Sequence, residues 1–311
     1  MSLFSLIAAL LLEQFRPFEY RSRINRFFIR YANYLEHRLN AGEHHHGALA
    51  WCLAVLPPVI FLAALGLTVY RLSPLLAWVM NVAVLYVTVG FKKFSETAND
   101  IAGALKSGDS ENARSLVGKW LGRATDECSD GEVARLSIEH VLMSAYRQLF
   151  GVIFWFLLLG AFGCGAAGAL LYTLAFTLYQ KWGGQSEHDF GSFGRFSIVV
   201  FDILDWLPLR MTAVSFAVMG DFEDAIYCWR GQAANWTQQG IGILLASGAG
   251  ALGVKLGGAL RCGGNVEFRC EIGLGDEADG DYIESALGLI WRTLMMWLVL
   301  LLLLTMASWA G

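Results

Sequence analysis

The sequence predicts an all-α, polytopic membrane helix bundle with an amphipathic helical cap. Of its 311 residues, 56% are hydrophobic and only 16% are charged, whereas soluble domains carry about 25% charged residues. Several segments stay apolar for the roughly 20 residues that a helix needs to cross a bilayer. No segment shows the two-residue alternation typical of a β-strand.

The membrane segments are recognised as long apolar runs. The clearest is LGLIWRTLMMWLVLLLLLTMASW, whose only charged residue is Arg292. The N-terminal run MSLFSLIAALLLEQF lacks a basic n-region and a cleavage site, so it predicts a retained short membrane helix rather than a signal peptide. The expected spans are 3–13 (short), 48–70, 74–91, 150–179, 196–219, 240–260 and 287–309. We expect about six helices in the bundle.

One expected span, residues 150–179, is too long for a single perpendicular helix. It contains four closely spaced glycines, Gly160, Gly163, Gly165 and Gly168. Glycines at this spacing favour a kinked or tilted helix that packs closely against its neighbours.

Three polar stretches separate the apolar runs. Residues 14–47 are rich in arginine, which predicts a cytoplasmic position for this stretch under the positive-inside rule. Residues 92–148 have apolar residues at helical spacing and breaks near 107–109 and 125–131, which predicts three amphipathic helices forming the cap. Residues 261–286 are acidic and predict a loop. The chain then divides into 1–91 (N-terminal membrane helices and basic loop), 92–148 (cap) and 149–311 (membrane bundle with the acidic loop).

Charge and composition exclude some functions. The net charge is −4 and no basic block of the kind that binds nucleic acid stands out. We therefore expect no nucleic-acid partner. The expected partner is membrane lipid. The run His44–His46 precedes an apolar segment, and three adjacent imidazoles cannot all face one metal from a helix. We interpret it as a solvated loop and predict no metal site.

Charged residues inside the apolar segment SIVVFDILDWLPLRMTAV form a candidate site. Asp202 and Asp205 fall on one face of a helix, and Arg210 follows them. A charge at membrane depth is costly, so such residues usually face a cavity or a partner. The alternative is a break at Trp206–Pro208 that leaves all three charges at the membrane surface.

The run ASGAGALGVKLGGALRCGG, residues 246–264, is rich in glycine. It has neither the spacing of a Walker loop nor a preceding strand, which disfavours a phosphate-binding loop. Small residues at this density favour close helix packing.

Several short patterns occur in a fixed order between about residues 92 and 290. They comprise Ala98, Ala102, Ala104, Leu105, Gly108, Asp109, Ala113 and Arg114; Gly122, Arg123 and Thr125; Val133, Ala134, Arg135 and Glu139; Phe154 and Trp155; Phe193 and Gly194; Asp202, Trp206, Pro208, Arg210 and Thr212; and Ala249–Gly258. In this order they resemble the CobD/CbiB family, membrane proteins that make adenosylcobinamide phosphate in cobalamin assembly.

The resemblance implies an ATP-dependent synthase that forms an amide between aminopropanol phosphate and a corrinoid propionate. It implies a ligand site for a corrinoid or another anionic small molecule, lined by Arg123, Thr125, Arg135, Asp205 and Arg210. It implies that Glu139 and Asp202 serve the metal or proton transfer, with ATP and Mg²⁺ as cofactors if the activity is retained.

The chain departs from the family pattern at several carboxylates. A Glu-Asn pair and a following Asp are replaced by Met143, Ser144 and Arg147, and another Asp by Ala175. Phe201 replaces the first of two paired aspartates, and Leu245 replaces a further acid. An arginine at 147 repels a metal but attracts anions, so the departures predict ligand binding with very slow turnover or none.

Two alternative functions remain open from the sequence. The AmpE proteins, a related branch linked to sensing of cell-wall and β-lactam stress, resemble this chain at Arg147 and at Asp205–Arg210 but lack the glycine-rich run. A transporter is the other alternative, because a charged cavity within a helix bundle is also typical of transporters.

Overall fold

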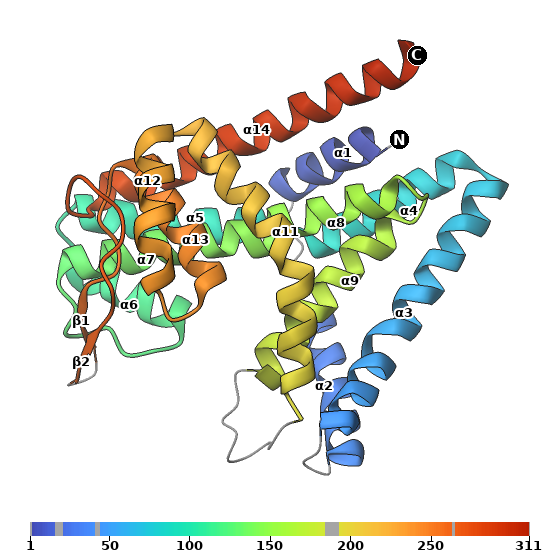
Figure 1. Cartoon of the computed structure of the whole chain (residues 1–311), viewed down its shortest axis with the longest axis horizontal. Coiled ribbons are helices and arrows are strands. Elements are labelled where there is room, and N and C mark those ends of the chain that lie inside the picture. The colour runs from blue at the N-terminus through green and yellow to red at the C-terminus, as the bar shows by residue number, and fades with distance from the viewer. Residues whose placement is uncertain (1, 16–20, 41–43, 184–192, 263–264, 311) are drawn as a thin grey trace. The chain divides into compact units, whose positions relative to one another are not determined.

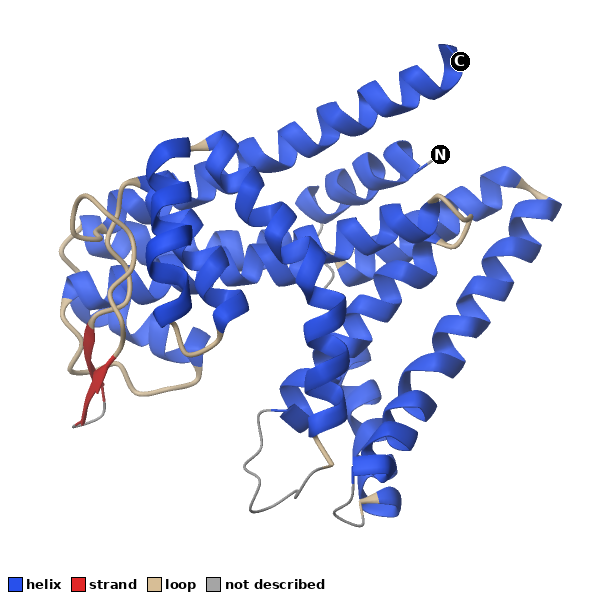
Figure 2. Ribbon diagram, in the orientation of Figure 1, coloured by secondary structure: helices blue, strands red, loops and turns tan. Residues whose placement is uncertain are grey.

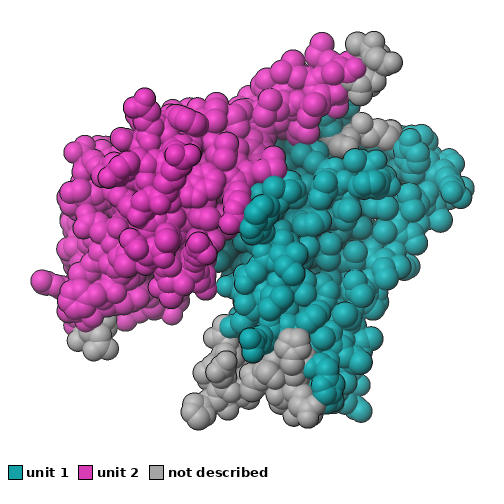
Figure 3. Space-filling model, viewed as in Figure 1, with its two compact units in different colours: residues 1–90, 147–208 teal, residues 91–146, 209–311 magenta. Residues whose placement is uncertain are grey.

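The computed structural model describes residues 2–15, 21–40, 44–183, 193–262 and 265–310. The described chain is helical apart from one small two-stranded sheet and its loops (Figures 1 and 2). It forms two compact units, residues 1–90 with 147–208 and residues 91–146 with 209–311 (Figure 3). The all-α fold class is therefore confirmed.

The first unit is entirely helical in its described part. Its elements are α1 (Ser2–Phe15), α2 (Arg21–Leu39), α3 (His44–Leu72), α4 (Pro74–Thr88), most of η1 (Tyr146–Phe150), α8 (Gly151–Gly160), α9 (Gly165–Leu178), η2 (Tyr179–Gly183) and the first part of α11 (Arg195–Met219). The two η elements are π-helical turns. The central helix is α9, which contacts α3, α4 and α8. The expected short N-terminal helix is present as α1.

The segment 150–179 is two helices, so the single kinked helix that we predicted is wrong. The chain reverses direction through Gly163, whose φ of 79° is readily adopted only by glycine. In the resulting hairpin, a Cβ on Gly168 would lie 2.2 Å from the backbone oxygen of Trp155. The glycines thus serve a turn and a close helix contact, which the sequence alone could not distinguish from a kink.

The second unit is built around α7. Its elements are α5 (Phe91–Lys106), α6 (Ser110–Leu121), α7 (Asp130–Ala145), the rest of α11, α12 (Phe222–Gln232), η3 (Ala233–Asn235), α13 (Gln239–Leu252), β1 (Ala259–Cys262), β2 (Asn265–Phe268) and α14 (Gly280–Ala310). Helix α7 is buried over most of its length and contacts α5, α6, α13 and α14. Three helices are thus present within 92–148, as predicted; that they form an amphipathic cap stays a prediction.

Local signals explain where these helices begin and end. Asp109 caps α6 by accepting a hydrogen bond from the Asn112 N–H, and Gly122 closes the helix in a left-handed conformation. Helix α7 begins with a capping box between Ser129 and Glu132.

Four described helices are long and apolar enough to cross a membrane: His45–Leu72, Pro74–Lys106, Asp130–Gly160 and Gly280–Ala307. Three of them expose apolar side chains, such as Phe61 (69%) and Leu304 (66%), whereas Asp130–Gly160 is mostly buried. Exposed apolar surface of this kind is typical of helices that contact lipid. Leu3–Phe15 and Gln239–Leu252 are shorter apolar helices.

Two of the expected spans therefore need correction. Helix α13 ends at Leu252, so residues 240–260 are not one span. Helix α11 continues through Pro208, which rules out the alternative of a break there. Because α11 contains Asp202, Asp205 and Arg210, it is not among the helices that are apolar enough to cross a membrane.

Two loop predictions are also corrected. The acidic segment 261–286 contains part of the antiparallel pair β1–β2, and α14 already begins at Gly280. Four-residue strands are too short to give a readable alternation. His44 begins α3, so the histidine run opens a helix rather than lying in a loop.

We predict that Gly168→Ala destabilises the α8–α9 hairpin by about 1–3 kcal/mol, because the added methyl group meets rigid backbone. Thermal unfolding of the full chain in detergent measures this change. The matched control is Gly103→Ala on α5, where an added Cβ meets nothing within 4 Å; it should be neutral or slightly stabilising. Equal melting temperatures for wild type and Gly168→Ala would contradict the prediction.

Candidate functional site

Three charged side chains of α7 hold the loop that follows α13. Spaced by three and four residues, Glu132, Arg135 and Glu139 project from the same side of the helix. Glu132 accepts a hydrogen bond from the Arg261 N–H at 2.9 Å. Arg135 donates to the Gly257 carbonyl at 2.9 Å. Glu139 accepts from the Gly257 N–H, also at 2.9 Å. These contacts fix the loop backbone from 257 to 261 against α7.

The strongest contact in this region is the ion pair between Glu139 and Arg269. The guanidinium donates to both carboxylate oxygens, at 2.6 and 3.1 Å. The two side chains are 4% and 16% exposed, respectively, and Arg269 also lies over the Trp236 ring, 5.5 Å from its centroid. With the Gly257 N–H, Glu139 accepts three hydrogen bonds. In this arrangement it is a paired anchor rather than a free base.

The glycine-rich run has two parts with different roles. In α13, a Cβ on Gly250 would lie 2.5 Å from the Asp224 carbonyl oxygen, so close helix packing is confirmed there. Gly253 then ends the helix, and Gly257 and Gly258 have φ values of 74° and 73°. A Cβ on Gly257 would lie 2.1 Å from the Cys270 carbonyl oxygen. The second part is therefore a loop that only glycine can form without strain.

Arg123 and Thr125 lie in the turn after α6. Arg123 forms a half-exposed ion pair with Glu267 on β2, at 3.5 Å. Thr125 is buried, and its hydroxyl donates to the Arg114 carbonyl at 2.7 Å. A Cβ on Gly118 would lie 2.8 Å from that hydroxyl oxygen. Thr125 therefore helps to fix the turn that carries Arg123.

The remaining predicted residues lie on α11. Asp205 is half-buried and accepts a hydrogen bond from the Tyr172 hydroxyl at 2.9 Å within the first unit. Asp202 is exposed, and Arg210 belongs to the second unit. The structure thus brings Arg123, Arg135 and Glu139 to one loop. Their convergence with the α11 residues stays a prediction.

Some arginine N–H donors around the loop lack a hydrogen-bond acceptor among the described residues. Among the described residues, the buried Nε atoms of Arg123, Arg135 and Arg269 have no hydrogen-bond partner. The described part of the chain contains no group of three His, Cys, Asp or Glu side chains able to hold a metal ion. Three guanidinium groups around one loop suit an anion, which can accept their N–H donors.

Sequence reasoning missed two residues of this network, Arg269 and Glu132. Arg269 lies within the segment that we interpreted as an acidic loop. Glu132 could have been found, because its distance of seven residues from Glu139 places both on one side of α7.

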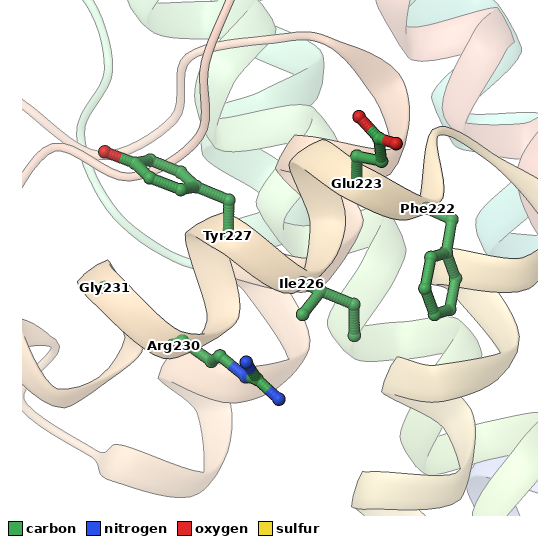
Figure 4. Close-up of a pocket in the computed structure, with 6 residues that line it drawn as sticks. All are labelled: Phe222, Glu223, Ile226, Tyr227, Arg230 and Gly231. Atoms are coloured by element: carbon green, nitrogen blue, oxygen red, sulfur yellow. The ribbon is translucent and has the colours of Figure 1, made fainter.

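A shallow surface pocket lies on α12, lined by Phe222, Glu223, Ile226, Tyr227, Arg230 and Gly231 (Figure 4). None of the predicted site residues lines it. On the same helix, Cys228 is buried, and burial raises the pKa of its thiol to about 11. The thiol therefore stays protonated and unreactive at neutral pH.

Comparisons with known proteins agree with the resemblance read from the sequence. The family model described as CobD/Cbib protein matches residues 6–290. The cobalamin biosynthesis protein CobD of Stutzerimonas stutzeri is 36% identical over 307 residues, which cover 97% of this chain and 98% of that protein. The protein of the same name from Chromobacterium violaceum is 37% identical over 243 residues, 78% of this chain and 76% of its own.

A more distant relative, the CobD protein of Photorhabdus laumondii, is 27% identical over 60% of this chain and 58% of its own. No solved structure matches the chain significantly. The family match over residues 6–290 and a relative aligned along almost the whole chain show that this protein belongs to the CobD/CbiB family.

Proposed function

We propose that this protein acts in cobalamin biosynthesis as a multi-pass protein of the bacterial inner membrane that binds an anionic precursor. The observation that carries this proposal is the family match over residues 6–290, together with relatives named for cobalamin biosynthesis. The same names favour this function over the AmpE-like alternative. The ligand is a corrinoid carboxylate or an aminoalcohol phosphate.

The proposed binding surface is the loop face of α7. Arg123 and Arg135 supply the guanidinium groups, and Arg210, on the part of α11 that belongs to the same unit, is the third cation of the proposed site. Thr125 acts through the turn that positions Arg123. Planar guanidinium forks suit phosphate and carboxylate groups, which accept two parallel hydrogen bonds.

The family reaction also implies ATP and Mg²⁺. Glu139 does not fit as their ligand, because Arg269 and the Gly257 N–H already occupy its oxygens. Mg²⁺ usually requires one or two protein carboxylates in addition to the phosphates. Asp202 is exposed and is the other acid at a family position. We therefore propose that this chain retains ligand binding while its amide-forming turnover is very slow or absent.

The first prediction concerns turnover in the cell. Expressed in a host that lacks its own synthase and grows where cobalamin is essential, the chain should support little or no growth. Immunoblotting of membranes checks that the protein is present, and the host's own gene is the positive control. Robust growth would show that Glu139 and Asp202 suffice, and the proposed loss of turnover would be wrong.

The second prediction concerns binding. The purified full chain should retain adenosylcobyric acid, followed by the visible absorbance of the corrinoid after equilibrium dialysis. Arg123→Gln should weaken binding by about tenfold, because a charge-assisted hydrogen bond is lost. The matched control is Lys119→Gln, which removes the same charge from an exposed position on α6. Absence of corrinoid binding by wild type would contradict a corrinoid ligand, and titration with aminopropanol phosphate then tests the other ligand.

The third prediction separates anchoring from chemistry at Glu139. Glu139→Gln should lower the free energy of unfolding by about 3–5 kcal/mol, because it leaves a buried guanidinium without its carboxylate. It should also open the loop 253–279 to limited proteolysis.

The double variant Glu139→Gln with Arg269→Gln should lose less free energy of unfolding than the sum of the two single changes. Arg123→Gln, which breaks a half-exposed pair, should change stability by about 1 kcal/mol or less. If Glu139→Gln is as stable and as protease-resistant as wild type, the anchoring role is wrong.

A further inference from the structure

One charge inside an apolar helix has no counter-ion in the described chain. Arg147 lies in the candidate membrane helix Asp130–Gly160, 17 residues after its start and 13 before its end. Between 141 and 160 it is the single charged residue. It is half-buried, and among the described residues its guanidinium makes no ion pair or hydrogen bond.

Aromatic rings hold this guanidinium in place. Its central carbon lies 5.0 Å from the centroid of the Phe176 ring, a distance typical of cation–π contacts. Phe176 packs on Phe201, which is stacked by Tyr179 at 4.7 Å. The acid bonded to this cluster, Asp205, accepts from the Tyr172 hydroxyl instead. The ring contact takes one face of the guanidinium and leaves its in-plane N–H donors available.

The local backbone is also unusual. Residues Tyr146–Phe150 form a π-helical turn between α7 and α8. Such turns are rare and occur frequently at functional sites. Placing a charged side chain at membrane depth costs free energy, so such charges normally have a partner. None of the described residues supplies this partner, and an anion bound from outside the chain would satisfy the same requirement.

We infer that Arg147 binds the phosphate group of a ligand through the in-plane N–H groups of its guanidinium, on an aromatic platform formed by Phe176, Tyr179 and Phe201. The site belongs to the first unit, whereas the arginines of the α7 loop belong to the second, and it does not depend on the proposed role in cobalamin biosynthesis. A phospholipid headgroup and a soluble phosphate ester both offer this chemistry.

Two measurements on the full-length protein distinguish these sources. In the first, the protein is placed in nanodiscs of equal parts phosphatidylglycerol and phosphatidylcholine, and native mass spectrometry counts the phosphatidylglycerol molecules it retains. In the second, inorganic phosphate is titrated calorimetrically into protein in a neutral detergent. Retention in the first identifies a lipid headgroup, and binding in the second identifies a soluble phosphate group.

Arg147→Gln should lose the retained lipid or weaken phosphate binding by about tenfold or more. The matched control is Arg38→Gln, which removes the same charge from an exposed arginine that lies over Tyr34 at 5.3 Å; its binding should equal that of wild type. No binding by wild type in either experiment, or equal binding by Arg147→Gln, overturns the inference.

A second variant covers the case in which Arg147→Gln does not fold. Arg147→Lys keeps the charge but cannot form two parallel hydrogen bonds from one plane. Weaker binding by this variant, which must elute as a monodisperse species on size exclusion, supports the site. Binding equal to that of wild type overturns it.

Discussion

The second unit depends on the contact between Glu139 and Arg269. This pair joins the central helix of the unit to a loop that is distant in sequence. Removing two charges from water is costly, and their attraction offsets that cost only when the geometry is good and the remaining lone pairs are satisfied. Both conditions are met, because the guanidinium is bidentate and the Gly257 N–H supplies a further donor. The glycines at 257 and 258 allow the loop backbone to come this close.

The same physical rule explains how the first unit places charges among apolar helices. Glu36 on α2 accepts hydrogen bonds from Lys181 and from the Trp182 indole, and both side chains of the ion pair are 13% exposed. Asp205 is bonded to Tyr172. Both of these acids have a polar partner within the unit, whereas Arg147 lies over the Phe176 ring and makes no ion pair or hydrogen bond among the described residues. This difference in pairing is the basis for the anion site that we propose at Arg147.

The fold class and the helices of residues 92–148 could be predicted because their signals are local. Apolar run length, helical spacing and capping residues such as Asp109 and Ser129 act within a few residues. The hairpin at Gly163 and the strands β1 and β2 could not be predicted, since glycine permits several backbone paths and four residues carry no readable period. The pairing of Glu139 with Arg269 also could not be predicted, because no local sequence pattern relates residues 130 positions apart. Family resemblance predicted Glu139 and Arg135 as site residues, whereas their hydrogen-bond partners were found only in the structure.

The order in which the chain is synthesised has a consequence for its assembly. Glu139 is synthesised 130 residues before Arg269. At a synthesis rate of about 5–20 residues per second, roughly 6–26 s pass before Arg269 is available to pair with it. During that interval the Glu139 carboxylate lacks its partner and must stay hydrated or be shielded by the insertion machinery. The loop that carries Arg269 can therefore pack on α7 only late in synthesis. The second unit reaches its native structure when almost the whole polypeptide has been made.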